Sequence, residues 1–134
     1  IRLHPDHIEP DVWMVGCWSG MDGKIIEMAG KAPIKALVVD ALGCGNVPPL
    51  CRKEMMKLGA KGLPMVLTTR VPTGNVMEEY SYEGSALSMK DSGLILGDRL
   101  SAWKARLLLV VALGVTKDRE ELRKIFESLA DGVR

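Results

Sequence analysis

The stretch that decides the fold is residues 34–69, IKALVVDALGCGNVPPLCRKEMMKLGAKGLPMVLTT. It opens with an apolar run at residues 34–42 and closes with another at residues 63–69, and each has the length of a buried strand. Between them two prolines open a helix, and its apolar face is formed by Cys51, Met55 and Leu58. Two apolar strands joined by a helix indicate a parallel β-α-β unit whose sheet is covered on both faces.

The alternation of strand and helix continues toward the amino end. An apolar run at residues 12–17 predicts a strand, and apolar residues at helical spacing over 21–29 predict a helix that ends at Gly30. Residues 1–10 are mostly polar and contain two prolines, so we expect a leading arm or linker before a domain that covers residues 11–134. The chain begins with isoleucine, from which we expect a fragment, a processed product or a trimmed chain.

The same pattern continues toward the carboxyl end. A long polar segment and a short helix at residues 86–91 precede a very short fourth strand at residues 94–96. Residues 101–113 are predicted to form the longest helix, and a last helix begins at Thr116 or Asp118. The fold class that follows is α/β: a small, flavodoxin-like, three-layer domain with a four-stranded parallel sheet.

Length, charge and cysteine content exclude several classes of function. A chain of 134 residues has the usual size of one domain. A net charge of +1, without a basic stripe interleaved with aromatic residues, argues against nucleic acid as a partner. The longest apolar run, residues 107–113, is too short to cross a membrane. Three cysteines without a C-x-x-C pair predict reduced thiols in an intracellular, cytoplasmic protein.

A ligand site is predicted at one edge of the sheet. In open α/β sheets, ligands bind beyond the carboxyl ends of the strands. Those ends carry three polar turns here, at residues 17–20, 43–46 and 68–70. Glycines let the backbone approach a ligand, and Asn46 offers both a donor and an acceptor, which suits an amide or a zwitterion. The competing explanation is that glycine and asparagine only shape a βα turn.

The sequence does not carry the groups of a complete enzyme. A Ser or Cys nucleophile needs a neighbouring base, and both histidines, His4 and His7, lie in the leading arm. That arm would have to fold back over the strand ends to serve Cys17 or Ser19. The histidines have no further metal-ligand cluster beside them, and no phosphate-binding signature is present. We therefore expect no catalytic residue, no metal and no cofactor.

The predicted helix at residues 101–113 is apolar on every side over residues 107–113. A surface helix of a small domain normally keeps one polar face. Either the sheet and the last helix cover this helix completely, or it contacts another domain or subunit.

Four segments of the chain form motifs: residues 41–48, ALGCGNVP, residues 68–74, TTRVPTG, residues 80–84, YSYEG, and residues 97–106, GDRLSAWKAR. The first resembles the G-x-G-N-x-P turn of the bacterial L-asparaginase family, and the second resembles that family's S-[ST]-R-x-x-x-G stretch. The third resembles the Y-x-Y-E-G segment of its cytosolic-type members. The fourth resembles the G-D-L-T-x-x-K-A-R motif that opens a late helix. The four segments follow the family order, and the resemblance spans roughly residues 12–130.

The resemblance covers only the smaller, C-terminal domain of that family, whose members hydrolyse asparagine, sometimes glutamine, to the acid and ammonia. It implies a threonine nucleophile in an N-terminal catalytic domain, so we expect the present chain alone to be inactive. It also implies that Asn46 binds the substrate's α-amino end in a neighbouring subunit's active site. Strict spacing from Arg70 places Ser81 where the family has an acidic residue, and Glu83, with Tyr82 beside it, is the nearest substitute.

The predicted substrate-binding residues are therefore Asn46, Tyr82 and Glu83. The predicted partners are asparagine or glutamine, an N-terminal catalytic domain, and further copies in a homodimer or homotetramer. Two other functions stay open. One is a stand-alone small-molecule-binding or assembly module, and the other is part of a glutaminase-like component of a tRNA-dependent amidotransferase. The intact mass of the natural product would separate the stand-alone module from the enzyme.

Overall fold

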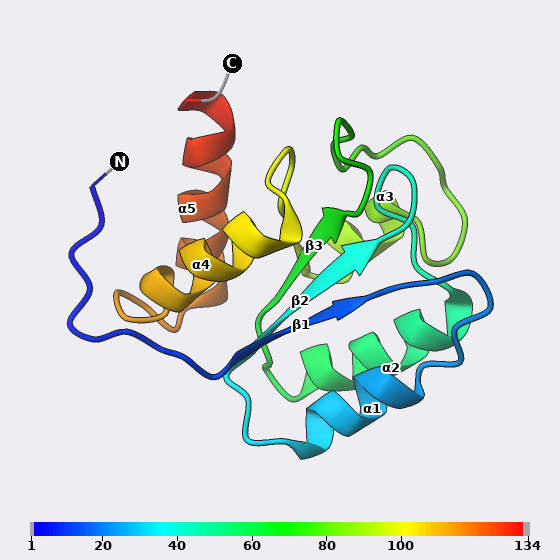
Figure 1. Ribbon diagram of the computed structural model, residues 1–134, viewed down its shortest axis with the longest axis horizontal. Coiled ribbons are helices and arrows are strands. Elements are labelled where there is room, and N and C mark those ends of the chain that lie inside the picture. The colour runs from blue at the N-terminus through cyan, green and yellow to red at the C-terminus, as the bar shows by residue number, and fades with distance from the viewer. Residues whose placement is uncertain (1, 133–134) are drawn as a thin grey trace.

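The computed structural model describes residues 2–132. One all-parallel sheet has the strand order β1-β2-β3-β4 (Figure 1). Its register pairs Val12 with Ala36 and Val66 with Ile95. The predicted four-stranded parallel sheet is confirmed; its strands are β1 (Val12–Gly16), β2 (Ala36–Ala41), β3 (Met65–Thr69) and β4 (Ile95–Leu96).

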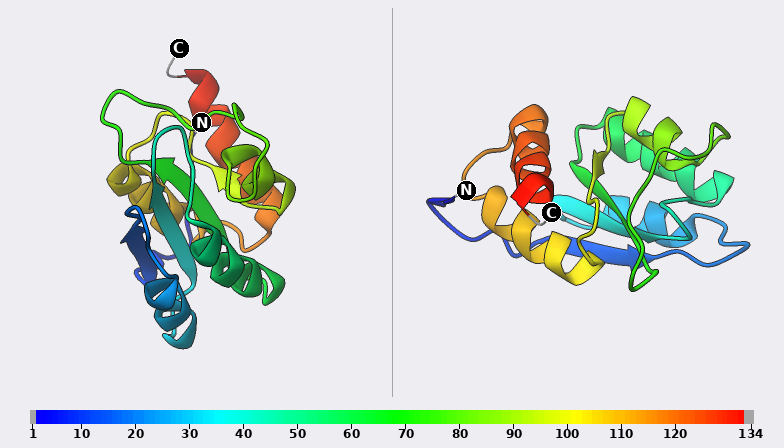
Figure 2. Two further views of the ribbon diagram at one scale, coloured as in Figure 1. Left: turned by 90° about the vertical axis from the view of Figure 1, so that its right-hand side faces the viewer. Right: turned by 90° about the horizontal axis from the view of Figure 1, so that it is seen from above.

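Helices cover both faces of this sheet (Figures 1 and 2). One face is covered by α1 (Lys24–Lys31), α2 (Pro49–Ala60) and α3 (Ala86–Asp91). The other is covered by α4 (Ala102–Ala112) and α5 (Arg119–Gly132). The strand order explains this division, because successive right-handed crossovers in one direction place all their helices on the same face. The predicted three-layer α/β architecture is confirmed.

The central strand β2 explains why residues 34–69 decide the fold. Leu37 and Val39 are fully buried against α1, α2 and α3, and Val38 is fully buried toward α4 and α5. A strand buried on both faces has no polar alternation. The unbroken apolar sequence of its first four residues, 36–39, follows directly from that position.

Several helices begin at a proline or directly after a short polar side chain that caps the helix. Pro49 is the first residue of α2, where its missing N–H costs nothing. Ser101 caps α4, and its hydroxyl accepts from the Lys104 amide at 3.5 Å. Asp118 accepts from the Glu121 amide at 2.9 Å. Asp118 rather than Thr116 therefore provides the cap of α5.

Two sequence-based expectations about helices are wrong. The longest helix is α5 with 14 residues, whereas α4 has 11. Gly30 does not end α1 but lies within it. A Cβ on Gly30 would stand 2.3 Å from Leu58 Cδ2, so this glycine permits the close packing of α1 on α2.

Helix α4 is only partly covered by its own domain. Leu109 and Ala105 are fully buried against the sheet, but the side chains of Trp103 and Leu107 are 70% and 62% exposed. The complete cover considered from the sequence is therefore not provided by the described residues. No helix within residues 2–132 combines the length and the apolar character that a membrane span requires.

Residues 2–10 contain no helix or strand and lie against the end of α4. The amide of Asp6 donates to Gly114 O at 2.9 Å, and the amide of Glu9 donates to Val110 O at 3.1 Å. A Cβ on Gly114 would collide with His7 O, at 1.8 Å. The arm is therefore packed at the end of the domain where β1 begins.

Candidate functional site

The turn after β2, residues 43–46, is held by its own backbone. The Asn46 amide donates to Leu42 O at 2.8 Å, and the Leu42 amide donates to Asn46 O at 2.9 Å. Gly43 and Gly45 have φ values of +52° and +106°, in the region that favours glycine. From the end of β3, the Thr69 hydroxyl donates to Gly43 O. Asn46 is thereby fixed at the carboxyl edge of the sheet.

A second segment, residues 76–84, is docked on this turn. The Met77 amide donates to Cys44 O at 2.9 Å, and the Val47 amide donates to Gly84 O at 2.9 Å. Gly84 has a φ of +96°, and a Cβ there would stand 2.4 Å from Val47 O. A residue without a side chain is thus needed where the two segments meet. We refer to residues 43–47 and 76–84 together as the edge site.

Tyr82 and Glu83 reach the edge site on this second segment. Tyr82 is about half exposed, and partial burial, followed by the neighbouring Cys44 and Tyr80, raises the pKa of its hydroxyl. The centres of the Tyr80 and Tyr82 rings are 6.1 Å apart. The Glu83 side chain is mostly exposed, and its Oε1 accepts from Arg52 Nη1 at 3.2 Å. The structure therefore brings Asn46, Tyr82 and Glu83, the three predicted residues, to one edge of the sheet.

Two buried polar atoms at this edge have no hydrogen-bond partner among residues 2–132: Asn46 Oδ1 and Arg52 Nε. The amide nitrogen of Asn46 makes one long contact, 3.8 Å, to Cys44 Sγ. An unsatisfied buried polar group costs about 1–3 kcal/mol. Such groups are rare in native structures, and each one calls for an explanation. A ligand that supplies the missing donor or acceptor is one explanation that fits an edge of this kind.

Arg52 is the residue of this region that the sequence did not reveal. It is the fourth residue of α2, and its amide donates to Pro48 O at 3.0 Å. In the sequence it stands beside Lys53, and nothing distinguishes the two as partners for a distant acid. The ion pair with Glu83 links positions 31 residues apart. Only the docking of residues 76–84 on the turn creates it.

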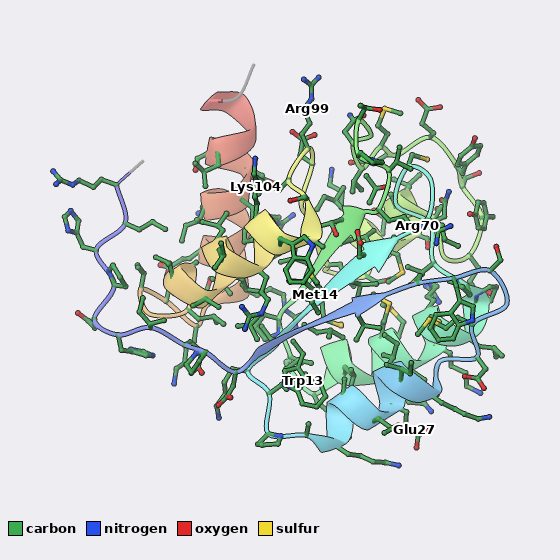
Figure 3. The ribbon with its side chains drawn as sticks, viewed as in Figure 1. Trp13, Met14, Glu27, Arg70, Arg99 and Lys104 are labelled. Carbon is green, nitrogen blue, oxygen red and sulfur yellow. The ribbon has the colours of Figure 1, made fainter. Side chains whose placement is uncertain are left out.

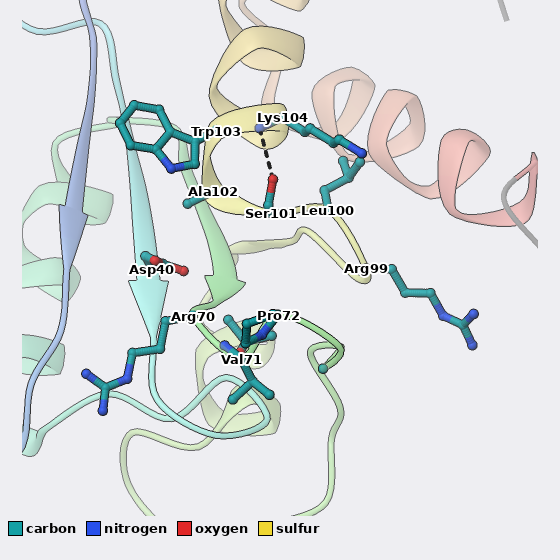
Figure 4. Close-up of a pocket in the computed structure, with 12 residues that line it drawn as sticks. Asp40, Arg70, Val71, Pro72, Arg99, Leu100, Ser101, Ala102, Trp103 and Lys104 are labelled. Carbon is teal, nitrogen blue, oxygen red and sulfur yellow. Dashed lines mark hydrogen bonds between the residues drawn. The ribbon is translucent and has the colours of Figure 1, made fainter.

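A separate cavity of about 350 Å³ lies at the same edge, beside the start of α4 (Figure 4). Asp40, Arg70 and the first turn of α4 line it, and Asp40 Oδ1 accepts from the Thr68 hydroxyl at 3.2 Å. Burial raises the pKa of the Asp40 carboxyl. Arg99, at the rim, extends away from the domain (Figure 3). None of the three predicted site residues lines this cavity, so it is distinct from the edge site.

The thiols and histidines are not arranged for nucleophilic catalysis. Cys17 and Cys51 are buried free thiols. Burial, followed by the neighbouring Cys51, raises the pKa of Cys17 to about 12. A thiol acts as a nucleophile in its thiolate form, which is scarce at neutral pH for such a group. His4 and His7 belong to the arm before β1, whereas Cys17 follows the other end of that strand. The structure therefore does not bring a histidine to Cys17.

Comparison with known proteins identifies a family for most of the chain. Residues 11–126 match the family model described as the glutaminase/asparaginase C-terminal domain. The match covers the whole sheet, helices α1 to α4 and the first part of α5, and it includes every residue of the edge site.

Several curated proteins are similar to this chain. A probable L-asparaginase of Deinococcus radiodurans is 41% identical over 91 residues, which are 67% of this chain and 27% of that protein. The L-asparaginase of Bacillus licheniformis is 33% identical over 109 residues, 81% of this chain and 34% of that protein. A glutamyl-tRNA(Gln) amidotransferase component of Methanobrevibacter smithii is 26% identical over 119 residues, 88% of this chain and 27% of that protein.

The chain thus spans about a third or less of the length of these relatives. The family match, by contrast, covers most of the chain, from residue 11 to residue 126. The chain therefore belongs to the glutaminase/asparaginase C-terminal domain family.

Proposed function

We propose that this domain is the C-terminal part of an L-asparaginase-type amidohydrolase, which converts asparagine and water to aspartate and ammonia. In this proposal the edge site binds the α-ammonium group of the substrate. The N-terminal catalytic domain supplies the nucleophile, and the edge site completes the active site of a neighbouring subunit. The observation that carries the proposal is the unpaired, buried Oδ1 of Asn46, on a fixed turn that is hydrogen-bonded to the segment carrying Glu83.

The chemistry of the edge site suits an ammonium group. An ammonium group has three N–H donors and no acceptor. Asn46 Oδ1 is an acceptor without a donor among the described residues, and the ion pair of Glu83 uses Oε1, which leaves Oε2 for a second donor. Tyr82 precedes Glu83 on the docked segment. A charge-assisted hydrogen bond to Glu83 would supply most of the attraction.

The surface of α4 supports a role in assembly. Trp103 and Leu107 project from this helix and are mostly exposed. Large exposed apolar side chains that lie close together mark contact surfaces. We infer that α4 contacts another domain or another copy, in a homodimer or homotetramer. The free thiols Cys17, Cys44 and Cys51 support a location in the cytoplasm, where thiols stay reduced.

The experiment that tests the α-amino role is Asn46→Ala in the full-length protein. Loss of one hydrogen bond to a charged group costs about 1.5–3 kcal/mol, so kcat/KM for asparagine is expected to fall roughly ten- to hundredfold. Succinamic acid, which lacks the α-amino group, is expected to lose much less. Asn75→Ala is the matched control, because it removes the same side chain outside the edge site.

Melting temperature is measured on the same preparations. If Asn46 only shapes its turn, the variant loses thermal stability while both substrates suffer equally, and that result would refute the α-amino role. The present chain alone is expected to release no ammonia from asparagine, since the proposed nucleophile lies in the other domain. Release of ammonia from asparagine by the purified chain at an ordinary enzymatic rate would contradict the proposal that the nucleophile lies in the other domain.

A further inference from the structure

We propose that Arg52 is a positioning residue for Glu83 and that the pair makes the edge site selective for substrates with an α-ammonium group. This inference rests on the proposed function. It goes beyond that function because it assigns the selectivity to a residue of α2, outside the four segments that carry the family resemblance.

Arg52 is anchored, whereas Glu83 is not. Arg52 lies in the first part of α2, its amide is bonded within the helix, and its side chain is 23% exposed. Glu83 lies on the docked segment, and its side chain is 69% exposed. A free glutamate side chain samples many rotamers, and ordering it on substrate binding carries an entropic cost. A bond from a rigid helix reduces that cost before the substrate arrives.

The hydrogen bonds of Arg52 indicate that the role of its side chain is to hold Glu83. Its Nη1 donates to Glu83 Oε1 at 3.2 Å, while its buried Nε has no partner among residues 2–132. A guanidinium that mainly stabilised the domain would bond its buried donor to the backbone. Arg119 does so, donating from Nη2 to Gly59 O at 3.0 Å. Arg52 instead directs its head group to the carboxylate that the proposed function assigns to the substrate.

The pair leaves room for the substrate. The bond from Arg52 uses one carboxylate oxygen of Glu83, and a carboxylate accepts several hydrogen bonds through its two oxygens. The second oxygen is left for another donor at the edge site. A substrate ammonium group would meet a preset acceptor there, together with Asn46 Oδ1. A substrate without an ammonium group would gain nothing from the pair.

A double-mutant cycle in the full-length protein tests this inference. The variants are Arg52→Gln, Arg52→Lys, Glu83→Gln and the Arg52→Gln/Glu83→Gln double variant. The matched control is Lys57→Gln, which breaks the Lys57–Glu54 ion pair of 2.7 Å on the same helix. KM and kcat are measured for asparagine and for succinamic acid.

Arg52→Gln is expected to raise KM for asparagine about three- to fivefold, as for a partly exposed ion pair, with little change in kcat. Arg52→Lys is expected to keep most of the wild-type KM, and KM for succinamic acid is expected to stay unchanged. Once Glu83 is glutamine, Arg52→Gln should add no further loss, because the two residues act as one unit.

Independent, multiplying losses in the double variant would overturn the positioning role, as would equal losses for both substrates. If the wild-type protein hydrolyses asparagine and the Arg52 variants have the same KM for asparagine, only the role of Arg52 is refuted. A wild-type protein that does not hydrolyse asparagine refutes the proposed function itself, and this inference with it. The two failures are therefore distinguished by the wild-type assay.

Discussion

Gly84→Ala is the substitution that most directly tests how the edge site is built. Gly84 lies where residues 76–84 meet the turn that carries Asn46, and its carbonyl accepts from the Val47 amide at 2.9 Å. Its φ is +96°, and an added Cβ would stand 2.4 Å from Val47 O. Backbone on both sides of this contact leaves no flexible side chain to move aside. The added methyl group must therefore push the two segments apart.

The cost can be worked out from its parts. A positive φ costs a residue with a side chain about 1–2 kcal/mol. Separation of the segments breaks the bond to Val47, which is worth about 0.5–1.5 kcal/mol. Gly84→Ala is thus expected to lose about 1.5–3.5 kcal/mol of unfolding free energy, which lowers the melting temperature by roughly 5–17 °C in a domain of this size. Gly62→Ala is the matched control, since Gly62 has a φ of +87° and nothing within 4 Å of its Cβ position. It should lose only the first contribution.

Urea and thermal unfolding of the present chain, followed by circular dichroism, measure the difference between the two variants. In the full-length protein, Gly84→Ala should also raise KM for asparagine, because Glu83 moves away from Asn46. Gly62→Ala should not, since Gly62 follows α2 at the opposite end from the edge site. Equal losses of stability in the two variants would show that the segments are not held by the contact at Gly84, and the account of the edge site would fail.

Two further predictions concern charge and assembly. Burial raises the pKa of Asp40 above its unfolded value, so the folded state binds more protons between the two pKa values and loses stability as pH rises through that window. Asp40→Asn should therefore raise the melting temperature at pH 7, a gain that disappears below the unfolded pKa; a lower melting temperature at pH 7 would contradict it. Leu107→Lys on the exposed side of α4 should reduce self-association of the full-length protein, measured by sedimentation. Met28→Lys, at a similarly exposed position of α1, is the control and should not reduce it. Unchanged self-association of the Leu107 variant would contradict a role of α4 in the interface.

The sequence predicted the three layers well, because a strand that is buried on both faces of a sheet has a recognisable apolar sequence. The unbroken apolar run at residues 36–39 of β2 has no other stable place than the middle of a covered sheet. Side chains also show what the pattern alone does not: Trp13 and Met14 lie on opposite faces of β1 (Figure 3), and Trp13 remains 47% exposed because β1 is an edge strand.

Glycine was the less reliable signal. A glycine near a helix end indicates either a left-handed C-terminal residue or a close approach of two backbones. Gly30 does neither: it lies within α1 and makes room for the side chain of Leu58, 28 positions away in the sequence. Helix α4 shows the same limit in another form. Its leucines look equivalent in the sequence, yet Leu109 is fully buried and Leu107 is mostly exposed.

Asn46 was predicted from its place at the carboxyl end of a strand, whereas Tyr82 and Glu83 were predicted only from the resemblance, and the structure shows why spacing would not suffice for them. Asn46 and Glu83 come together because the Val47 amide donates to Gly84 O and the Met77 amide donates to Cys44 O. Neither a valine nor a glycine in the sequence predicts that its backbone makes such a hydrogen bond. Arg52 is still less visible, since a basic residue on a helix is ordinarily solvated. When a site is formed by hydrogen bonds between two backbone segments, its polar side chains look like ordinary surface residues in the sequence. For this domain, the unpaired buried atoms Asn46 Oδ1 and Arg52 Nε are a better guide than the sequence pattern to the place where we propose that a ligand binds.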